Sequence, residues 1–356
     1  MATPARFTAD SLTAFLLAAL AAGGADAATA DAATRAMMHA SRLGVDSHGV
    51  RLLPYYLGVI ATGEVKGKPD LALTRGKGAT AVLEADSAIG HLACYRAMEA
   101  AVDIARQQGI GAVTIRNMSH MGAAGAYALW AAEQGMIGLL TANSDAAVRL
   151  HDGRDPFPGT SPIAVGAPAP GGRPWLLDMA TSAIPMNRVL LFRSLGLTLP
   201  DDVAADATGR TTTDPHAATV LSPLGGAYGY KGAGLAGLVE ILSAPLCGMD
   251  LSTDLVPMYA ASTGQPRAMG GFALAINPDA FVSPEIYAAI LVRYLANIRA
   301  AVPADGATGR PMAPGDREWA VETERLKNGV PVDPDSVAAF KTLSEKHGLA
   351  LPVEVA

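Results

Sequence analysis

The stretch "IGAVTIRNMSHMGAAGAYALWAAEQGMIGLLTANS", residues 110–144, decides the fold class. It begins with a short apolar run, continues through a Gly-containing loop into a helical stretch that ends at Gly135, and closes with a second apolar run. Short apolar runs bounded by turn signals are typical of strands, and glycine often follows the end of a helix. The stretch therefore predicts a strand, a loop, a helix and a further strand, as in a mixed α/β domain.

The same alternation extends to both sides of this stretch. A helix is expected over 91–109, and short strands are expected over 79–86, 161–168, 175–180 and 270–278. Apolar residues at helical spacing mark the two ends of the chain, over 11–22, 29–43, 50–61, 283–300 and 333–348. The pattern predicts an α+β protein whose discontinuous helical domain, residues 1–75 and 283–356, surrounds a mixed-sheet domain of residues 76–282.

The composition limits the classes of partner. The net charge is −6 and no basic run is present, which argues against nucleic acid and anionic membranes, because both require clustered Lys and Arg. No apolar run approaches the roughly 20 residues of a membrane span. Cys94 and Cys247 lie outside any CxxC pattern, which predicts reduced thiols in a cytoplasmic protein. The seven histidines show no zinc-site spacing, but a small anionic substrate is compatible with this composition.

The N-terminus permits two interpretations. Arg6, the apolar run "TAFLLAALAA" and "ADAA" imitate a signal peptide with a cleavage site. The same residues also form an amphipathic helix with Thr8 or Asp10 near its start and Gly23 at its end. Because only one cation precedes the apolar run, we favour the helix.

Two glycine-containing segments are candidate cofactor sites. The loop after the strand at 110–117 carries His120, Gly122 and Gly125, and backbone amides at a helix start can bind a phosphate. This loop lacks the G-x-G-x-x-G fingerprint, so its glycines could equally serve only a tight turn. In "GGAYGYKGAGL", residues 225–235, Gly232 follows Lys231 where a P-loop has Ser or Thr. That segment predicts a helix start with one cation facing a cleft, or a flexible surface loop.

A third segment, "LLDMATSAIPMN" at residues 176–187, ends a strand with Asp178. A carboxylate in this position could accept hydrogen bonds from sugar hydroxyls. Alternatively, Asp178 and Thr181 could cap a helix.

The segment "VDSHGVRLLPYY", residues 45–56, combines groups that bind an anion and move a proton. His48 alone is more often a packed core histidine than a catalyst. Ser47 does not indicate a hydrolase, because the G-x-S-x-G elbow is absent from the sequence. Helical spacing predicts His48, Arg51 and Tyr55 on one face, where a bound anion could contact both His48 and Arg51.

The chain resembles the non-Rossmann malate/L-lactate dehydrogenase family over about residues 8–350. The motifs that match, in order, are "GVDSHGVRLLPYY", "NMSHMGAAGAYA", "GTSPIAVGAP", "LLDMATS", "LSPLGGAYGYKGAGL" and "RPMAPGDRE". The resemblance implies a cofactor-binding fold unrelated to the Rossmann fold, formed by residues 76–282. It also implies NAD or NADP as cofactor, reduction of a 2-oxo acid or a cyclic imine acid, and a homodimer with its active site near the interface.

The resemblance also implies roles for individual residues. It places His48, Ser47 and His120 at the reacting centre and Arg51 as the carboxylate clamp. Further substrate-side positions are Tyr55, Thr160 and Asn187. The implied cofactor contacts are His120, Gly122, Ser144, Asp178, Met179, Ala180, Lys231, Arg310 and Gly315. Two substitutions depart from the family pattern, namely "IPMNR" after "ATS" and Gly271 where many relatives have histidine, so the substrate of a relative cannot be transferred.

Hydride transfer to a carbonyl needs a proton donor that works near neutral pH, and histidine fits that range. We favour His48 as the donor, because Ser47 and Arg51 accompany it, with His120 orienting the carbonyl or the nicotinamide. Two other classes of protein remain open, a cofactor-free lyase or hydratase of a hydroxy acid and a binding module without activity.

Overall fold

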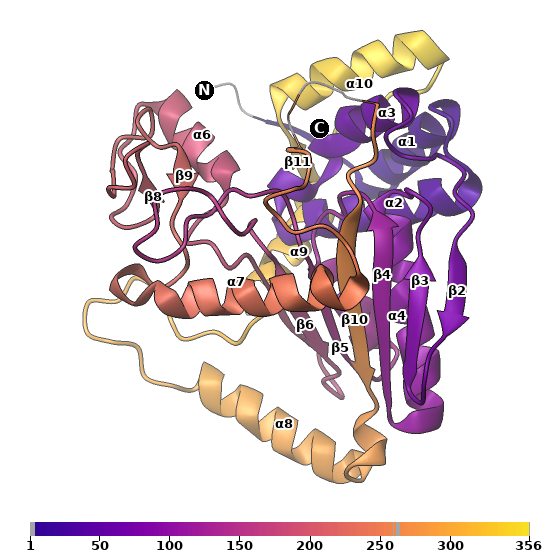
Figure 1. The fold of residues 1–356 in the computed structure, drawn as a ribbon, viewed down its shortest axis with the longest axis vertical. Coiled ribbons are helices and arrows are strands. Elements are labelled where there is room, and N and C mark those ends of the chain that lie inside the picture. Colours follow the sequence, from indigo (N-terminus) through magenta and orange to yellow (C-terminus); the bar gives the residue numbers. More distant parts are fainter. Residues whose placement is uncertain (1–3, 259, 261–263, 356) are drawn as a thin grey trace.

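A mixed seven-stranded sheet forms the centre of the protein (Figure 1). The computed structural model describes residues 4–258, 260 and 264–355. In spatial order the strands are β2 (Ala72–Arg75), β3 (Thr80–Glu84), β4 (Ile110–Met118), β10 (Met269–Ile276), β5 (Ile137–Ala142), β6 (Ile163–Ala167) and β7 (Trp175–Met179). β3 and β4 run parallel and the other neighbouring pairs run antiparallel. The predicted mixed sheet is confirmed, and the sheet differs from the mostly parallel Rossmann sheet.

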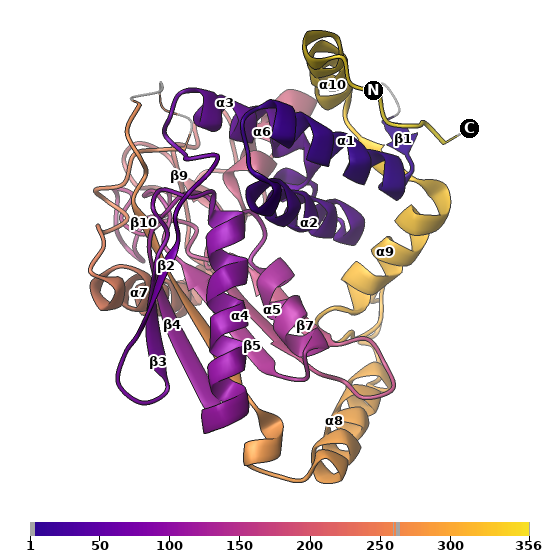
Figure 2. The ribbon, with the colours of Figure 1, turned by 90° about the vertical axis from the view of Figure 1, so that its right-hand side faces the viewer.

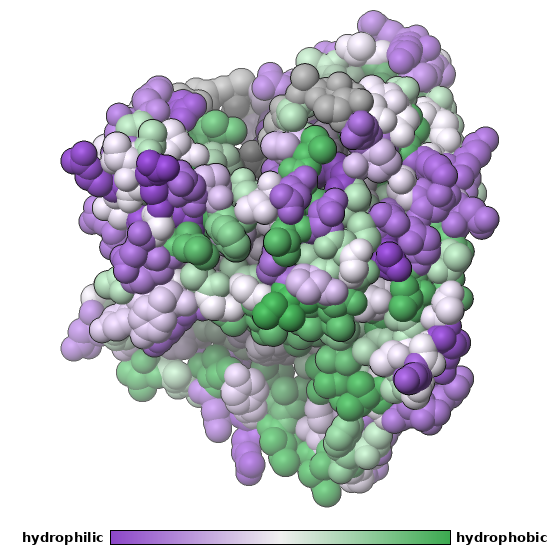
Figure 3. Space-filling view, viewed as in Figure 1, coloured by the Kyte–Doolittle hydropathy of each residue, from purple (hydrophilic) through white to green (hydrophobic). Residues whose placement is uncertain are grey.

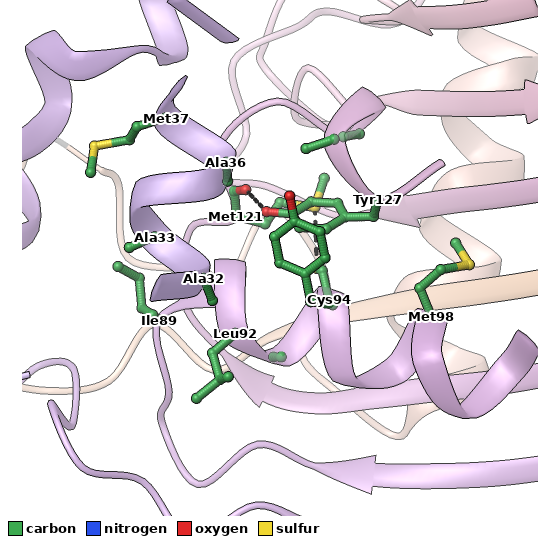
Figure 4. Close-up of a cluster of buried hydrophobic side chains, with 14 of the residues drawn as sticks. Ala32, Ala33, Ala36, Met37, Ile89, Leu92, Cys94, Met98, Met121 and Tyr127 are labelled. Carbon is green, nitrogen blue, oxygen red and sulfur yellow. Dashed lines mark hydrogen bonds between the residues drawn. The ribbon is translucent and has the colours of Figure 1, made fainter. Parts of the chain in front are cut away.

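Helices cover both faces of this sheet. α4 (Gly90–Gln108) and α5 (Gly125–Glu133) pack on one face, and α7 (Tyr230–Ser243) crosses the other (Figure 2). The sheet-facing side of α4 is rich in alanine, which lets the helix approach the strands closely. Side chains of α2, α4 and α5 form a buried apolar cluster around Tyr127 and Cys94 (Figure 4). This packed layer fixes the loop between β4 and α5 in place.

The two ends of the chain form one helical region. β1 (Ala5–Phe7) pairs with β11 (Val330–Val332), and the rings of Phe15 and Phe340 lie 5.0 Å apart. The helices of this region are α1 (Ala9–Ala22), α2 (Ala27–Leu43), α3 (Leu53–Ala61), α9 (Asp316–Asn328) and α10 (Pro334–His347). The predicted meeting of N- and C-terminal helices is confirmed.

The apolar N-terminal run folds as a capped helix. The Thr8 hydroxyl accepts a hydrogen bond from the backbone N–H of Ser11, and Gly23 ends α1. The apolar residues of the run, Leu12, Phe15, Leu16 and Leu20, are buried in the main core. Thr8, rather than Asp10, is therefore the capping residue. No described helix has both the length and the apolar character needed to cross a bilayer.

Residues 183–228 form a small lobe beside the sheet. It contains α6 (Met186–Leu195), β8 (Ala204–Ala205), β9 (Val220–Leu221) and the 3₁₀ turn η3 (Gly226–Tyr228), and it has its own apolar core around Val148, Val189 and Leu199. After α7 come the 3₁₀ turns η4 (Pro245–Cys247) and η5 (Pro278–Ala280), which flank β10. α8 (Pro284–Arg299) follows, and most of its length lies apart from the terminal helices (Figure 1).

The domain boundaries at 75/76 and 282/283 stay a prediction, and two elements bear on them. β2 lies before residue 76 but pairs with β3, so it belongs to the sheet. α8 lies after residue 282 and packs against η5, and it meets the helical region at its C-terminal end, where Arg299 pairs with Asp316 of α9.

Candidate active site

The segment after α2 forms two short turns rather than one helix. η1 (Asp46–His48) and η2 (Val50–Leu52) are 3₁₀ turns separated by Gly49, whose backbone is extended. A side chain at Gly49 would collide with the Ser41 hydroxyl, which accepts a hydrogen bond from the N–H of Val50. The predicted single helical face for His48, Arg51 and Tyr55 is therefore wrong, because the close approach to α2 breaks the helix.

An ion pair from the far end of the sequence holds this segment. Arg325 of α9 donates to both carboxylate oxygens of Asp46, with Nη2 2.9 Å from Oδ2. The same guanidinium donates to the backbone carbonyl of Ser41 over 2.5 Å. Asp46 thus fixes the turn that presents Ser47 and His48.

His120 follows β4 and approaches from the sheet. Gly122 has φ = +71°, a conformation that favours glycine, and it turns the chain back toward α5. A side chain at Gly122 would also meet the ring of His91. The turn therefore leaves His120 at the carboxyl end of β4, where the sequence predicted a ligand-binding position.

The two predicted histidines meet at the junction of the helical region and the sheet. The rings of His48 and His120 stack with centroids 5.6 Å apart and an interplanar angle of 24°. The Ser47 hydroxyl lies 2.9 Å from Nδ1 of His48, and the Tyr56 hydroxyl lies 2.8 Å from Nδ1 of His120. With both Nδ1 atoms engaged, Nε2 of each ring is the nitrogen left to face a reactant.

Two aromatic residues that the sequence analysis missed lie behind His120. Tyr56 is 1% exposed and packs edge-on against His91, with ring centroids 4.7 Å apart. Both nitrogens of the buried His91 lack a hydrogen-bond partner among the described residues. The double tyrosine in "PYY" was visible, but the expected helical face favoured Tyr55 over Tyr56.

The histidines of this cluster are uncharged near neutral pH. Burial, together with the Arg51 charge, lowers the pKa of His48 to about 4. Burial also holds the pKa of His120 well below its usual range, with contributions from the charges of His48 and Arg267. For His91, burial and the charge of His48 lower the pKa to about 3. A neutral imidazole has a lone pair that can accept a proton, but the low pKa values mean that the protonated ring requires stabilisation, for example by a bound anion.

Arg51 and Tyr55, the two residues of segment 45–56 that were predicted to contact the substrate, lie apart. The Arg51 side chain is exposed and lines a cavity of about 270 Å³ together with Asp46 and Asp333. The Tyr55 ring lies 6.4 Å from the His120 ring, and its hydroxyl lies close to the guanidinium of Arg267. Arg267 precedes β10, and no motif in the sequence pointed to it.

At the edge of the sheet where the cofactor is expected, the hydroxyl side chains of Ser144 and Thr181 form hydrogen bonds with the backbone of Thr160. The N–H of Thr160 donates to the Ser144 hydroxyl over 3.1 Å, and the Thr181 hydroxyl donates to the Thr160 carbonyl over 3.2 Å. Leu224 then donates its N–H to the Thr181 carbonyl over 2.9 Å, which brings the Gly-rich segment beside β7. Lys231 lies in the first turn of α7, exposed, with Nζ 5.3 Å from the Tyr228 ring.

Asp178 opens onto a second cavity of about 270 Å³, which Gly315 and His39 also line. Its Oδ2 accepts a hydrogen bond from the N–H of Gly125 over 2.9 Å, so this carboxylate occupies the start of α5 where the sequence suggested a phosphate. Desolvation by the surrounding protein atoms, aided by the Glu318 charge and opposed by the Gly125 hydrogen bond, raises the pKa of Asp178 to about 6. Burial, together with Arg42, lowers the pKa of His39 to about 3.

The remaining predicted residues are distributed around this cavity. Met179 and Ala180 continue from Asp178 and are half-buried. Arg310 is exposed and lies outside the cavity lining. Asn187 is in α6, and its side chain is outside the described part of the chain. No metal-binding group of His, Cys, Asp or Glu occurs among the described residues.

The departure at Gly271 has a physical basis in the core. A side chain there would lie 2.7 Å from Cε of Met118 and 3.3 Å from Cδ1 of Ile115. The Cε methyl of Met118 would therefore have to move before a larger side chain could be placed at position 271.

A fold of this kind, with two facing histidines between a helical region and a mixed sheet, defines a class of non-Rossmann dehydrogenase. The chain matches the malate/L-lactate dehydrogenase family over residues 7–341 and belongs to it. Membership makes the protein an oxidoreductase and argues against both the cofactor-free lyase and the inactive binding module.

The relatives differ in the acids named for them. The chain is 33% identical over 296 residues to L-sulfolactate dehydrogenase of Methanothermobacter thermautotrophicus, covering 82% of each chain. It is 34% identical over 270 residues to the NAD⁺-dependent ureidoglycolate dehydrogenase of Escherichia coli K12, covering 76% of each. Among solved structures, malate dehydrogenase from Entamoeba histolytica superposes with a TM-score of 0.91 at 26% identity, covering 98% of this chain and 99% of that one.

Proposed function

We propose that the protein interconverts a small 2-hydroxy acid and its 2-oxo acid with NAD or NADP. The stacked pair of His48 and His120 carries this proposal, because both rings are oriented through Nδ1 and both are uncharged near neutral pH. The names of its relatives, which include malate, sulfolactate and ureidoglycolate dehydrogenases, support the same reaction class.

The residues of the sheet edge fit a nicotinamide dinucleotide. The Asp178 carboxylate faces a cavity and can accept hydrogen bonds from ribose hydroxyls, while Ser144 and Thr160 offer hydroxyls nearby. Lys231 supplies a cation for a phosphate group. At about 270 Å³, the cavity beside Asp178 is near the lower end of small-molecule pockets, which start at about 300 Å³, so it suits one portion of the dinucleotide. The bound nicotinamide would supply or accept the hydride.

We assign the proton to His120, with His48 as its partner. The sequence favoured His48 on account of Arg51, but the Arg51 side chain is exposed. His120 is held by the buried Tyr56. In the tautomer whose Nδ1–H donates to the Tyr56 hydroxyl, Nε2 carries a free lone pair that can face the reactant. During oxidation the neutral Nε2 accepts the hydroxyl proton, and during reduction the protonated ring returns it.

A cyclic imine acid is the second candidate substrate. The chain superposes on Δ1-piperideine-2-carboxylate reductase from Pseudomonas syringae with a TM-score of 0.82 at 29% identity, covering 95% of this chain and 99% of that one. A panel of 2-oxo acids and cyclic imine acids, assayed with NADH and with NADPH, separates the two. No consumption of either reduced cofactor with any member of the panel would contradict the proposed function.

Replacing Lys231 by alanine is expected to raise the Kd of the reduced cofactor about tenfold or more. A hydrogen bond to a charged group contributes roughly 1.5–3 kcal/mol, and 1.4 kcal/mol corresponds to about tenfold in affinity. Titration of tryptophan fluorescence with NADH and NADPH measures this change. Lys341→Ala on α10 is the matched control for charge. Unchanged affinity for both cofactors would remove Lys231 from the cofactor site.

We also propose that the protein is a homodimer joined through α7 and α8. Ile286, Ile290 and Tyr294 form a stripe on α8 at helical spacing, and each is about half exposed. Leu238 and Ile241 add apolar surface on α7, and Figure 3 shows hydrophobic side chains gathered over both helices. Because Lys231 lies in the first turn of α7, such an interface would adjoin the part of the site proposed to bind the cofactor.

The double variant Ile286→Asp/Ile290→Asp is expected to be a folded monomer. A charge buried at an interface without a partner costs several kcal/mol, which dissociates a dimer of ordinary affinity. Light scattering coupled to gel filtration measures the mass. Ala296→Asp, exposed on another side of α8, is the control. A dimeric double variant, or a monomeric parent protein, would contradict this interface.

The thiols bear on the compartment. Cys94 and Cys247 are both free and buried. Unpaired thiols are typical of the reducing cytoplasm, which supports our proposal that the protein works there.

A further inference from the structure

Arg267 is a buried cation whose donors are incompletely used. It is 5% exposed, and its guanidinium pairs with the Asp145 carboxylate through Nη2. Nε donates to the backbone carbonyl of Val256 over 3.1 Å. The third nitrogen, Nη1, is buried and has no well-aligned acceptor among the described residues. A buried donor without an acceptor costs about 1–3 kcal/mol, and an incoming carboxylate removes that cost.

The position of Arg267 connects it to the reacting centre. Its guanidinium lies within hydrogen-bonding reach of the Tyr55 hydroxyl, and the Tyr55 ring is edge-on to His120 with centroids 6.4 Å apart. The Arg267 charge also acts on His120 itself. The carboxylate of a 2-oxo acid is bonded directly to the reacting carbon, so a cation beside His120 is where this group must be held.

We propose that Arg267, rather than Arg51, holds the substrate carboxylate, an inference that rests on the proposed function. Asp145 and Val256 fix two sides of the guanidinium, so the donor that remains is oriented before substrate arrives. Asp145 and Glu64 are the acids that act on the adjoining Tyr55, and the Asp145 ion pair offsets the cost of burying Arg267.

Arg51 is less suited to the role. Its side chain is exposed, and the Asp333 carboxyl beside it has a pKa lowered mainly by the hydrogen bonds from Ser336, with a smaller contribution from the Arg51 charge. An ion pair between an exposed arginine and a substrate carboxylate would be screened by solvent and would contribute about 0–1 kcal/mol. A guanidinium in the interior interacts more strongly with an anion, because the effective dielectric constant is lower.

The test compares Arg267→Lys with Arg51→Gln. Lysine retains the charge opposite Asp145 but lacks the planar fork. For Arg267→Lys, we expect the KM of the best 2-oxo acid to rise tenfold or more, while the Kd of NADH changes less than about twofold. For Arg51→Gln, we expect both quantities within about twofold of the parent. A tenfold rise in KM for Arg51→Gln, or an unchanged KM for a folded Arg267→Lys, overturns the proposal.

A binding measurement without turnover separates this inference from the proposed function. Oxalate, which resembles a planar 2-oxo acid, is titrated by calorimetry into the parent protein and both variants in the presence of NADH. Loss of oxalate affinity in Arg267→Lys alone supports the clamp even if no 2-oxo acid in the panel is reduced. Equal oxalate affinity in all three proteins overturns it. If Arg267→Lys does not fold, a loss of oxalate affinity in Arg51→Gln still overturns the proposal, and unchanged affinity there supports it.

Discussion

Replacing His120 by asparagine is expected to slow the reduction of the oxo acid, with a loss in kcat of about 10² to 10⁴, the usual contribution of general acid catalysis. The asparagine amide can keep the hydrogen bond that Tyr56 makes to Nδ1, but it has no group in place of Nε2. The loop after β4 should therefore keep its conformation while the proton donor is lost. Single-turnover reduction measured by absorbance of the reduced nicotinamide gives the rate of the chemical step.

His48→Asn is the matched comparison, because His48 stacks on His120 and is bonded through Nδ1 in the same way. We expect His48→Asn to raise the KM of the acid more than it lowers kcat. The Kd of NADH should stay close to the parent value in both variants. The assignment reverses if the greater loss of kcat occurs in His48→Asn.

Reduction is expected to accelerate strongly with acidity. The donor must be protonated, and burial keeps the pKa of His48 at about 4 and the pKa of His120 well below its usual range. Between pH 7 and 5, kcat/KM for reduction should rise about tenfold per pH unit, or roughly 100-fold in all, because only the protonated fraction of free enzyme reacts. For oxidation the neutral ring is the base, so kcat/KM should stay nearly constant over the same range.

The negative charge of the bound substrate allows a second test of this prediction, a comparison of the apparent pKa values in the two pH profiles. A bound carboxylate stabilises the imidazolium, so the apparent pKa in the kcat profile should exceed that in the kcat/KM profile. Two controls are needed. Below about pH 6.5 histidine is protonated in the unfolded chain, whereas the buried His91 of the folded protein stays neutral because its pKa is about 3. Acid therefore also destabilises the fold, and circular dichroism at each pH measures this effect. Asp178 loses its charge below about pH 6, so the Kd of NADH must be followed as well. Reduction that is independent of pH would show that a different group donates the proton.

Much of the fold was predictable, because the spacing of apolar residues and the glycines at the ends of helices are local signals in the sequence. The strands at 110–117 and 136–144 and the helix at 91–109 were located within two residues at each end. α6 and α9 were missed. α6 has no clear apolar face, and the first turn of α9 is highly charged, so neither gives a strong helical pattern. The pairing of β2 with β3 was also missed, since all four residues of β2 are exposed.

The site was less predictable, because its geometry depends on contacts between distant segments. Motifs identified His48 and His120, and the structure stacks them. Helical spacing put Arg51 beside His48, but the turn at Gly49 invalidates that spacing. Arg267 was not identified, since a single arginine before a strand carries no local signal of burial.

The ion pair between Asp46 and Arg325 has a consequence for biosynthesis. The ribosome makes the turn that presents His48 well before Arg325, which fixes this turn and lies 279 residues after Asp46 in the chain. During translation the apolar faces of α1 and α2 stay uncovered until α9 and α10, which pack against them, have been synthesised. The nascent chain is thus exposed to chaperones and proteases until α9 and α10 have been made, and activity begins only when these helices have packed against α1 and α2.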